Sequence, residues 1–261
     1  MSVAIGTSGR TNVISNTLTI ARRNLLHIKA TPEQLVEMSI QPLMFLVLFV
    51  FVFGGAIAGS SQEYLQFALP GILVQSVAFL PFTTALALNV DFQRGVIDRF
   101  RSLPIARSAV IGGRIMADGA RIVWSVLIIT GFGMLLGFGF GGGPAGAVGG
   151  LLLVTAFGLT MCWPMAFIGI TARTTESVNT WGFMIILPLT FASSAFVPPE
   201  SMPGWLEAVA TWNPVTAVID GARGLMLGGP VAEPLLRSVL WMVAIQAVFA
   251  PLAIARYRRR V

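Results

Sequence analysis

The sequence predicts an all-α integral membrane protein with six transmembrane helices in a single domain spanning residues 1–261. Hydrophobic residues make up 55% of the chain and charged residues only 11%, whereas a soluble domain carries about a quarter charged residues. The few charges are clustered, and they leave uncharged runs long enough to cross a bilayer, which takes roughly 20 residues in a helix. We therefore expect a multi-pass protein of the cytoplasmic (inner) membrane.

The first 37 residues precede the first uncharged run. They contain apolar residues at helical spacing, and the basic residues Arg22, Arg23 and Lys29 lie on other sides of the same helix. The apolar positions are Leu18, Ala21, Leu25 and Ile28. This pattern is typical of an interfacial amphipathic helix, which we expect within 1–37 on the inner membrane surface. The segment is too long for the basic region of a signal peptide, so we expect an uncleaved first span.

The uncharged runs locate the six spans. The longest run covers 51 residues, from Ile122 to Ala172, and is too long for one helix. We expect it to divide at GFGFGGGPAG (137–146), because glycine and proline favour a tight turn. The predicted spans are 39–58, 64–89, 115–137, 146–171, 177–197 and 236–255.

The arginines predict the orientation. With both ends in the cytoplasm, fifteen of the seventeen Lys and Arg residues lie inside, and the exceptions are Arg223 and Arg237. The positive-inside rule therefore predicts an N-in, C-in topology. The basic tail, 256–261, is expected to anchor the last span at the lipid headgroups, with contact to a specific partner as the alternative. Because the basic residues lie beside successive spans, we expect no nucleic-acid partner.

Several kinds of chemistry are excluded by composition. One cysteine, Cys162, and one histidine, His27, rule out an intramolecular disulfide and the usual zinc clusters, so we expect no metal. Asp118 and Arg121, near the inner end of the third span, are expected to form an interfacial ion pair rather than a proton relay. The only lysine, Lys29, lies outside any phosphate-binding G-x-x-x-x-G-K-[ST] motif. The chain is therefore expected not to be an enzyme: either it is passive, or another chain provides energy.

Charge is concentrated between the second and third predicted spans, in 91–104. If this segment is helical, it has an apolar stripe and a charged stripe at spacings of three or four residues, and Pro104 ends it. The stripes are Phe92, Val96 and Phe100 on one side and Asp91, Arg94, Asp98 and Arg101 on the other. The charged face could dock on a soluble partner. A solvated loop that obeys the positive-inside rule explains the spacing equally well.

The segment before the last span, 198–234, is broken by Pro198, Pro199, Pro203 and Pro214. SMPGWLEAVA (201–210) and NPVTAVIDGARGLML (213–227) are two short helical patterns, with Ser201 and Asn213 as expected N-caps. Tryptophans in this segment suit the headgroup belt. We expect a re-entrant helix pair over the outer mouth, with an ordinary surface loop as the alternative. Its outer gate would comprise Trp205, Trp212, Asn213 and Pro214.

Two blocks of the sequence carry a family resemblance. GVIDRFRSLPIARSAVIGGR (95–114) and FVPPESMPGWLEAVATWNPVTAVIDGARGLMLGGP (196–230) resemble segments of ATP-binding-cassette type-2 export permeases, particularly the daunorubicin-resistance permease family. The amphipathic N-terminus, six spans and basic tail also match, so the likeness covers nearly the whole chain. The sequence departs from that pattern at Arg94, where many of these permeases have a glutamate, and Asp98 is the candidate for the acidic role.

The resemblance implies the permease subunit of an exporter that moves hydrophobic drugs, lipids or glycolipids. Its partners would be two ABC ATPase subunits, which bind ATP and Mg²⁺, and a second permease, identical or related, besides membrane lipid and the hydrophobic substrate. The permease itself would need no cofactor. An energy-independent channel or membrane scaffold is the alternative. The coupling helix, 91–104, would sit in the ATPase subunit through Asp91, Phe92, Arg94, Val96, Asp98, Arg99, Phe100, Arg101 and Pro104.

The resemblance also implies where the substrate passes, because in that family the second and fifth spans commonly line the central path. Aromatic and methionine side chains suit an adaptable apolar cavity. For any single residue, lipid contact or helix packing is the alternative. The implied substrate-path residues are Gln75, Phe79, Phe82, Thr83, Asn89, Asn179, Trp181, Met184, Phe191 and Ser193.

Overall fold

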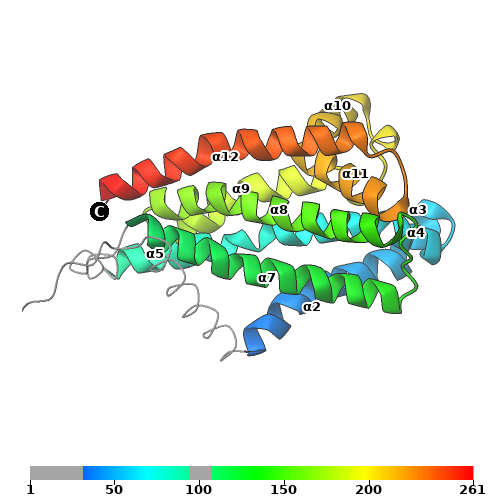
Figure 1. The fold of residues 1–261 in the computed structure, drawn as a ribbon, viewed down its shortest axis with the longest axis horizontal. Coiled ribbons are helices and arrows are strands. Elements are labelled where there is room, and N and C mark those ends of the chain that lie inside the picture. Colours follow the sequence, from blue (N-terminus) through cyan, green and yellow to red (C-terminus); the bar gives the residue numbers. More distant parts are fainter. Residues whose placement is uncertain (1–31, 95–106, 261) are drawn as a thin grey trace, which may run out of the picture.

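The computed structural model describes residues 32–94 and 107–260, with side chains from 39–94 and 118–259. Within these ranges the regular secondary structure is entirely helical. Long helices run side by side along the molecule (Figure 1). This confirms the predicted all-α class. Five stretches are long and apolar enough to cross a membrane: Ser39–Ala58, Ser61–Gln93, Asp118–Leu135, Gly143–Thr171 and Ala232–Arg259.

The first span is built from three consecutive helical pieces. α2 (Pro32–Leu48) continues through the π-helical turn η1 (Phe49–Phe53) into α3 (Gly54–Ala58). Gly59 ends α3 with a φ of 77°, a left-handed conformation that glycine adopts without steric cost. The predicted end of this span, at residue 58, is confirmed, whereas the helix that contains it begins before the predicted start, at Pro32.

The second span is one long helix with a proline in its middle. α4 (Ser61–Phe79) begins at Ser60, whose hydroxyl accepts a hydrogen bond from the Glu63 N–H at 3.1 Å. α5 (Pro81–Gln93) follows directly through Leu80, which keeps helical backbone angles. The combined stretch has 33 residues and is about 50 Å long at 1.5 Å per residue. It therefore extends beyond the hydrocarbon core at its ends, and beyond the predicted 64–89.

The third and fourth spans form a helical hairpin. α7 (Arg107–Leu135) and α8 (Gly143–Thr171) are joined at the predicted glycine-rich turn. Gly137 and Gly143 have φ angles of 100° and 70°, which explains why glycine is needed there. Gln62 and Gln66 of α4 donate hydrogen bonds to the Gly137 carbonyl at 2.7 and 3.1 Å, so the turn is fixed to the start of the second span.

The predicted fifth span corresponds to α9 (Thr175–Phe191), a helix of 17 residues that is not among the five candidate spans. The predicted end at 197 is wrong, because the helix stops at Phe191. The reason is local: the Ser193 hydroxyl donates to the Thr190 carbonyl and accepts from the Ala195 N–H. Such side-chain bonds compete with the helical pattern.

The segment before the last span contains the two predicted short helices, α10 (Gly204–Trp212) and α11 (Pro214–Leu227). Asn213 caps α11 as predicted, since its side-chain oxygen accepts from the Val215 N–H at 2.8 Å. The predicted cap at Ser201 is wrong. Ser201 lies in the short 3-10 helix η2 (Pro199–Ser201), where its hydroxyl donates to the Pro198 carbonyl. Pro203 precedes α10 instead.

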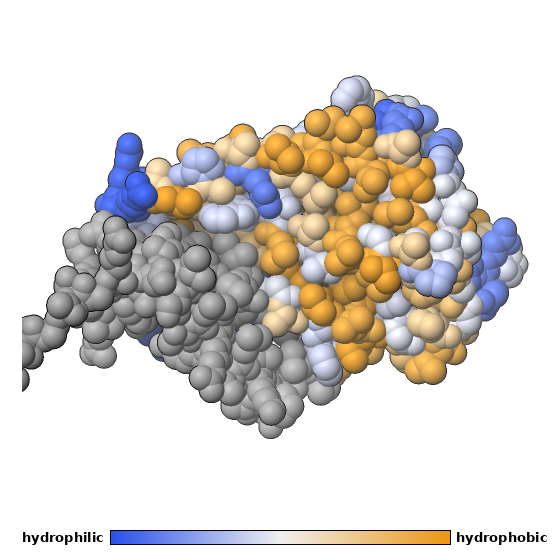
Figure 2. Space-filling view, in the orientation of Figure 1, coloured by the Kyte–Doolittle hydropathy of each residue, from blue (hydrophilic) through white to orange (hydrophobic). Residues whose placement is uncertain are grey.

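The core lies around α8, which contacts α5, α7, α11 and the last helix, α12 (Ala232–Arg260). Tyr64, Phe157 and Met165 are among its largest buried side chains. Figure 2 shows hydrophobic residues across the middle of one face and hydrophilic residues towards its ends. The exposed hydrophobic residues of the central belt are those a bilayer or another membrane subunit would cover.

Candidate functional site

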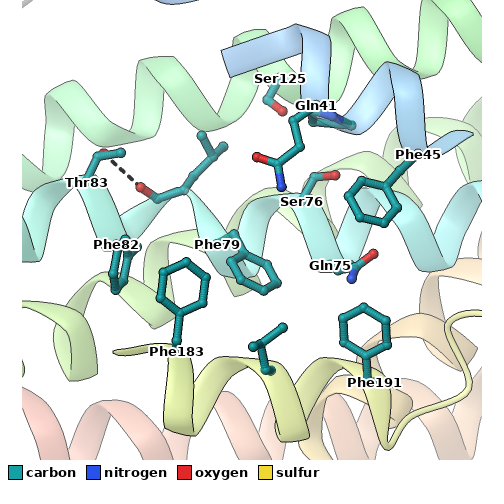
Figure 3. A pocket seen from close by; sticks show the side chains of 13 residues that line it. Gln41, Phe45, Gln75, Ser76, Phe79, Phe82, Thr83, Ser125, Phe183 and Phe191 are labelled. Atoms are coloured by element: carbon teal, nitrogen blue, oxygen red, sulfur yellow. Dashed lines mark hydrogen bonds between the residues drawn. The ribbon is translucent and has the colours of Figure 1, made fainter. Parts of the chain in front are cut away.

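A cavity of about 440 Å³ opens between α2, α4, α5, α7 and α9 (Figure 3). Its volume lies within the range of about 300–1,000 Å³ that is typical of small-molecule sites. No charged residue lines it within the described part of the chain. Its lining residues are Gln41, Pro42, Phe45, Gln75, Ser76, Phe79, Leu80, Phe82, Thr83, Ser125, Phe183, Leu187 and Phe191.

Phenylalanine rings form much of the cavity wall. The Phe82 and Phe183 rings lie 5.0 Å apart at an interplanar angle of 57°, and the Phe79 ring lies 6.4 Å from that of Phe183. Gly182 makes the approach possible, because a Cβ atom at this position would clash with the Phe82 ring. Figure 3 shows Phe45 and Phe191 further along the cavity. These surfaces suit apolar and aromatic ligands.

A few polar groups interrupt the aromatic wall. The Ser76 and Thr83 hydroxyls donate to backbone carbonyls of their own helix at 2.6 and 2.9 Å, so their donors are already used. Gln75 is only 7% exposed, and the Gln41 side chain ends near Ser76 in Figure 3. Ser125 is 1% exposed, and its hydroxyl oxygen has no hydrogen-bond partner among the described residues.

Half of the predicted substrate-path residues line this cavity, namely Gln75, Phe79, Phe82, Thr83 and Phe191. The other half do not, and their transport role stays a prediction. Asn89 is buried and donates hydrogen bonds to the Gly169 and Ala172 carbonyls at 3.1 and 2.9 Å, which ties α5 to the end of α8. Ser193 is also buried, whereas Asn179, Trp181 and Met184 are exposed on α9.

Several lining residues were missed by the sequence reasoning. On α9, Phe183 and Leu187 share the four-residue spacing of Phe191 and therefore its helix face; this signal was available in the sequence. Phe45 of α2 and Ser125 of α7 carried no such signal. Their contribution depends on which helices are neighbours, and hydropathy does not reveal that.

The inner end of α5 leads into the predicted coupling segment. Asp91 and Phe92 belong to the last turn of α5, and Arg94 follows as its exposed C-terminal cap residue. The Phe92 ring meets the Tyr257 ring of α12 edge-on, with centroids 5.7 Å apart. Any displacement of this turn would therefore act on α12 as well. The remaining predicted coupling residues, Val96, Asp98, Arg99, Phe100, Arg101 and Pro104, lie outside the described residues.

The predicted pair near the inner end of the third span is confirmed. Arg121 and Asp118 form an ion pair at 3.2 Å within α7. Asp118 is buried and also accepts a hydrogen bond of 2.6 Å from the Thr84 hydroxyl of α5. The carboxylate therefore joins two neighbouring helices.

Arg223 of α11 forms a buried network that the sequence reasoning missed. Its guanidinium donates two hydrogen bonds to the Phe67 carbonyl, at 3.2 and 3.0 Å, and one to the Ser194 carbonyl at 3.0 Å. It also pairs with Asp220 at 3.1 Å and lies 3.9 Å above the Phe67 ring. Burial lowers the pKa of Arg223 to about 10 against the opposing effect of Asp220, so the group stays charged at neutral pH.

The four predicted gate residues lie in two environments. Trp205 and Trp212 of α10 are exposed, as expected of tryptophans at the membrane interface. Asn213 is buried, and its amide donates hydrogen bonds of 2.7 Å to the Leu189 and Ala192 carbonyls. Pro214 is the first residue of α11. Asn213 thus joins the end of α9 to the start of α11.

The fold defines a multi-pass helical membrane protein with a cavity lined by uncharged, mostly apolar residues. Residues 15–227 match the family model described as ABC-2 type transporter. The chain belongs to the ABC-2 type transporter family and is a membrane permease of an ABC exporter in the cell membrane. This confirms the predicted family, and membership implies an ATPase partner subunit.

Three relatives illustrate the match. Daunorubicin resistance ABC transporter permease protein DrrB1 of Streptomyces coeruleorubidus is 38% identical over 251 residues, covering 96% of this chain and 89% of the relative. Probable doxorubicin resistance ABC transporter permease protein DrrC of Mycobacterium tuberculosis is 28% identical over 223 residues, covering 84% and 79%. Putative transport permease ycf38 of Cyanophora paradoxa is 28% identical over 225 residues, covering 81% and 74%.

Proposed function

We propose that this permease exports hydrophobic drugs, lipids or glycolipids through a path that includes the cavity between α2, α4, α5, α7 and α9. The observation that supports this proposal most directly is the composition of the cavity. Its lining combines five phenylalanines with uncharged polar groups and no charged side chain among the described residues. Such a lining favours apolar molecules and disfavours small ions, which would lose their hydration without gaining a partner. The drug-resistance names of two relatives point the same way.

We propose six spans in an N-in, C-in topology, with α9 as the fifth span. A helix of 17 residues is at the short end of the range that crosses a bilayer. The described helix ends support spans that alternate in direction. α5 ends near the C-terminus of α12 at one end of the molecule, whereas the α7–α8 turn contacts the start of α4 at the other end (Figure 1). The N-terminal interfacial helix of this proposal lies outside the described residues.

We propose that α10 and α11 form a re-entrant pair over the outer mouth. α11 packs against α4, α8 and α12 and buries most of its residues. Non-spanning backbone is tolerated at membrane depth only where protein shields it, and this packing supplies such a shield. Exposed tryptophans on α10 are consistent with an interfacial position.

The proposed working unit contains two copies of an ATPase subunit, which bind ATP and Mg²⁺, and a second permease, identical or related. The permease contributes no cofactor of its own. The segment after Arg94 is the proposed coupling helix, and the contact between Phe92 and Tyr257 offers a route from it to α12. Shifting a two-state equilibrium from 1:99 to 99:1 takes roughly 5.5 kcal/mol of differential binding, which ATP binding and hydrolysis by the partner would supply.

The proposed transport activity is tested with the permease and its ATPase partner in inverted vesicles. We expect ATP-dependent uptake of doxorubicin, the fluorescent drug in the name of a relative. Phe183→Ala should reduce uptake several-fold because it removes a cavity wall. Ile185→Ala is the matched control, since this residue of the same helix is 47% exposed, close to the 45% of Phe183, and is not among the residues that line this cavity. Solute movement without ATP or partner would instead identify an energy-independent channel.

The coupling role is tested separately on the same complex. Asp98→Arg and Phe100→Asp should abolish drug-stimulated ATPase activity while the permease remains folded. Arg99→Cys should crosslink to the ATPase subunit. Cys162, the only native cysteine, is buried, so the introduced thiol would be the reactive one. Crosslinking to lipid alone, or to nothing, contradicts docking at this segment.

A further inference from the structure

Ser125 departs from the behaviour of most other hydroxyl residues in these helices. Ser76, Thr155, Thr160 and Thr190 each donate to the carbonyl four residues earlier, at 2.6–2.9 Å. The Ser125 hydroxyl has no partner among the described residues although it is fully buried. Buried polar groups are nearly always hydrogen-bonded, so an unpaired hydroxyl at the edge of a cavity indicates a group that a ligand could satisfy.

A second polar group in the same cavity also has unused hydrogen-bonding capacity. The structure gives the Gln75 carboxamide no hydrogen bond to the described residues, although the side chain is almost entirely buried and lines the cavity. A carboxamide can both donate and accept, as can a hydroxyl. Figure 3 shows Ser125 on the helix behind the central one, near Gln41, whereas Gln75 extends from the central helix towards Phe191. The cavity therefore has uncharged polar groups beside its phenylalanine walls.

We propose that the cavity binds the aromatic part of molecules that carry an uncharged hydroxyl or carbonyl group on it, and that Ser125 is a specificity-determining residue that hydrogen-bonds this group. The inference rests on the proposed function and names its substrate class. Phe79, Phe82 and Phe183 would contact the ring system. Polar sites of this kind reject analogues that lack the hydrogen-bonding group, because the buried protein groups are then left unpaired.

The absence of charge from the lining is the reason for assigning an uncharged polar group to the part of the ligand inside the cavity. A charged group would be desolvated there without an opposite charge to compensate. The ion pair on the same helix, between Asp118 and Arg121, is already satisfied internally and by Thr84. Neither of its members lines the cavity. The ligand's polar group is therefore expected to be neutral.

The test compares two probes that differ by one hydroxyl, pyrene and 1-hydroxypyrene. Their binding to the purified full-length permease in detergent is measured by energy transfer from tryptophan, at a fixed micelle concentration. Ser125→Ala should weaken binding of 1-hydroxypyrene roughly 3- to 10-fold, the loss of one hydrogen bond, and leave pyrene binding unchanged. Partitioning of each probe into micelles is the same for every variant, so it cancels in the comparison.

Thr130→Val is the matched control. It removes another buried hydroxyl without a described partner from the same helix, at a position that does not line the cavity, and should change neither affinity. The thermal midpoint of Ser125→Ala should not fall, because the lost hydroxyl bonds to no described residue. Equal weakening of both probes, no weakening of either, or no binding to the wild type would overturn the inference. ATP-driven doxorubicin uptake that persists alongside such a result leaves the proposed function intact.

Discussion

Replacing Arg223 with methionine should strongly destabilise the outer half of the protein. Methionine keeps much of the side-chain length but removes the three hydrogen bonds to the Phe67 and Ser194 carbonyls, the ion pair and the contact with the Phe67 ring. The Arg223 side chain is only 18% exposed. Leaving the Phe67 and Ser194 carbonyls without their donors costs about 1–3 kcal/mol each, and with the lost contact to the Phe67 ring we expect a total loss of about 3–5 kcal/mol.

Asp220→Asn should have a much smaller effect, although it removes the other member of the ion pair. The Asp220 side chain is 40% exposed, so water screens its charge, and exposed ion pairs contribute about 0–1 kcal/mol. An asparagine oxygen can also still accept the hydrogen bond from the Ser194 hydroxyl, 2.8 Å from the present carboxylate. The expected asymmetry follows from the carbonyl contacts, which only Arg223 makes.

Thermal unfolding in detergent measures both effects, with a dye that becomes fluorescent on reacting with thiols. Cys162 is the only cysteine and is fully buried, so reaction reports unfolding. At about 2–4 °C per kcal/mol, Arg223→Met should lower the midpoint by roughly 6–20 °C and Asp220→Asn by less than about 4 °C. Arg237→Met, which breaks an exposed pair with Glu233, is the control and should stay near wild type. Equal losses for the Arg223 and Asp220 variants would refute the reasoning.

Two glycine substitutions give further predictions, one measured by thermal unfolding and the other by binding of 1-hydroxypyrene. Gly71→Ala should cost about 1–3 kcal/mol because its Cβ would meet the Ala195 backbone; a midpoint at or above that of the wild type would contradict this packing. Gly182→Ala should displace the Phe82 ring and weaken 1-hydroxypyrene binding, and unchanged binding would show that the ring is not needed there. Gly131→Ala is the control for both, since nothing lies within 4 Å of an added Cβ.

The membrane helices were predictable because the bilayer imposes a simple rule on sequence. A helix without charges over about 20 residues is required for each span, and the glycine-rich turn at 137–146 divided the longest run correctly. The end of α9 was not predictable from hydropathy. The residues after Phe191 remain apolar or small, and the helix ends where Ser193 bonds locally and where Asn213, the cap of α11, and Thr216 of α11 bond its last turn and the residues that follow.

The candidate site was predictable only in part. Phe79 and Phe82 were assigned to it through the family resemblance, and they line the cavity. Ser125 lies in an apolar run and has no distinguishing neighbour in sequence. Arg223 was noticed only as an exception to the charge distribution. Its role depends on Phe67 and Ser194, which lie 156 and 29 residues away in the chain.

The unbroken helix Ser61–Gln93 has fixed contacts at both of its ends. Near its start, the Tyr64 hydroxyl donates a hydrogen bond of 2.9 Å to the Phe196 carbonyl. At its other end, Phe92 meets Tyr257 of α12. The helix is therefore a rod held near each of its ends, and sliding it lengthwise would break both attachments together.

Bending this rod is easier, because Pro81 near its middle has no N–H to bond the preceding turn. The flexure point lies beside the cavity, between Phe79 and Phe82. A displacement at the Gln93 end would therefore respace these two rings before it loosened the attachment near Tyr64. Under the proposed coupling, the contacts of a bound molecule with these rings would change first.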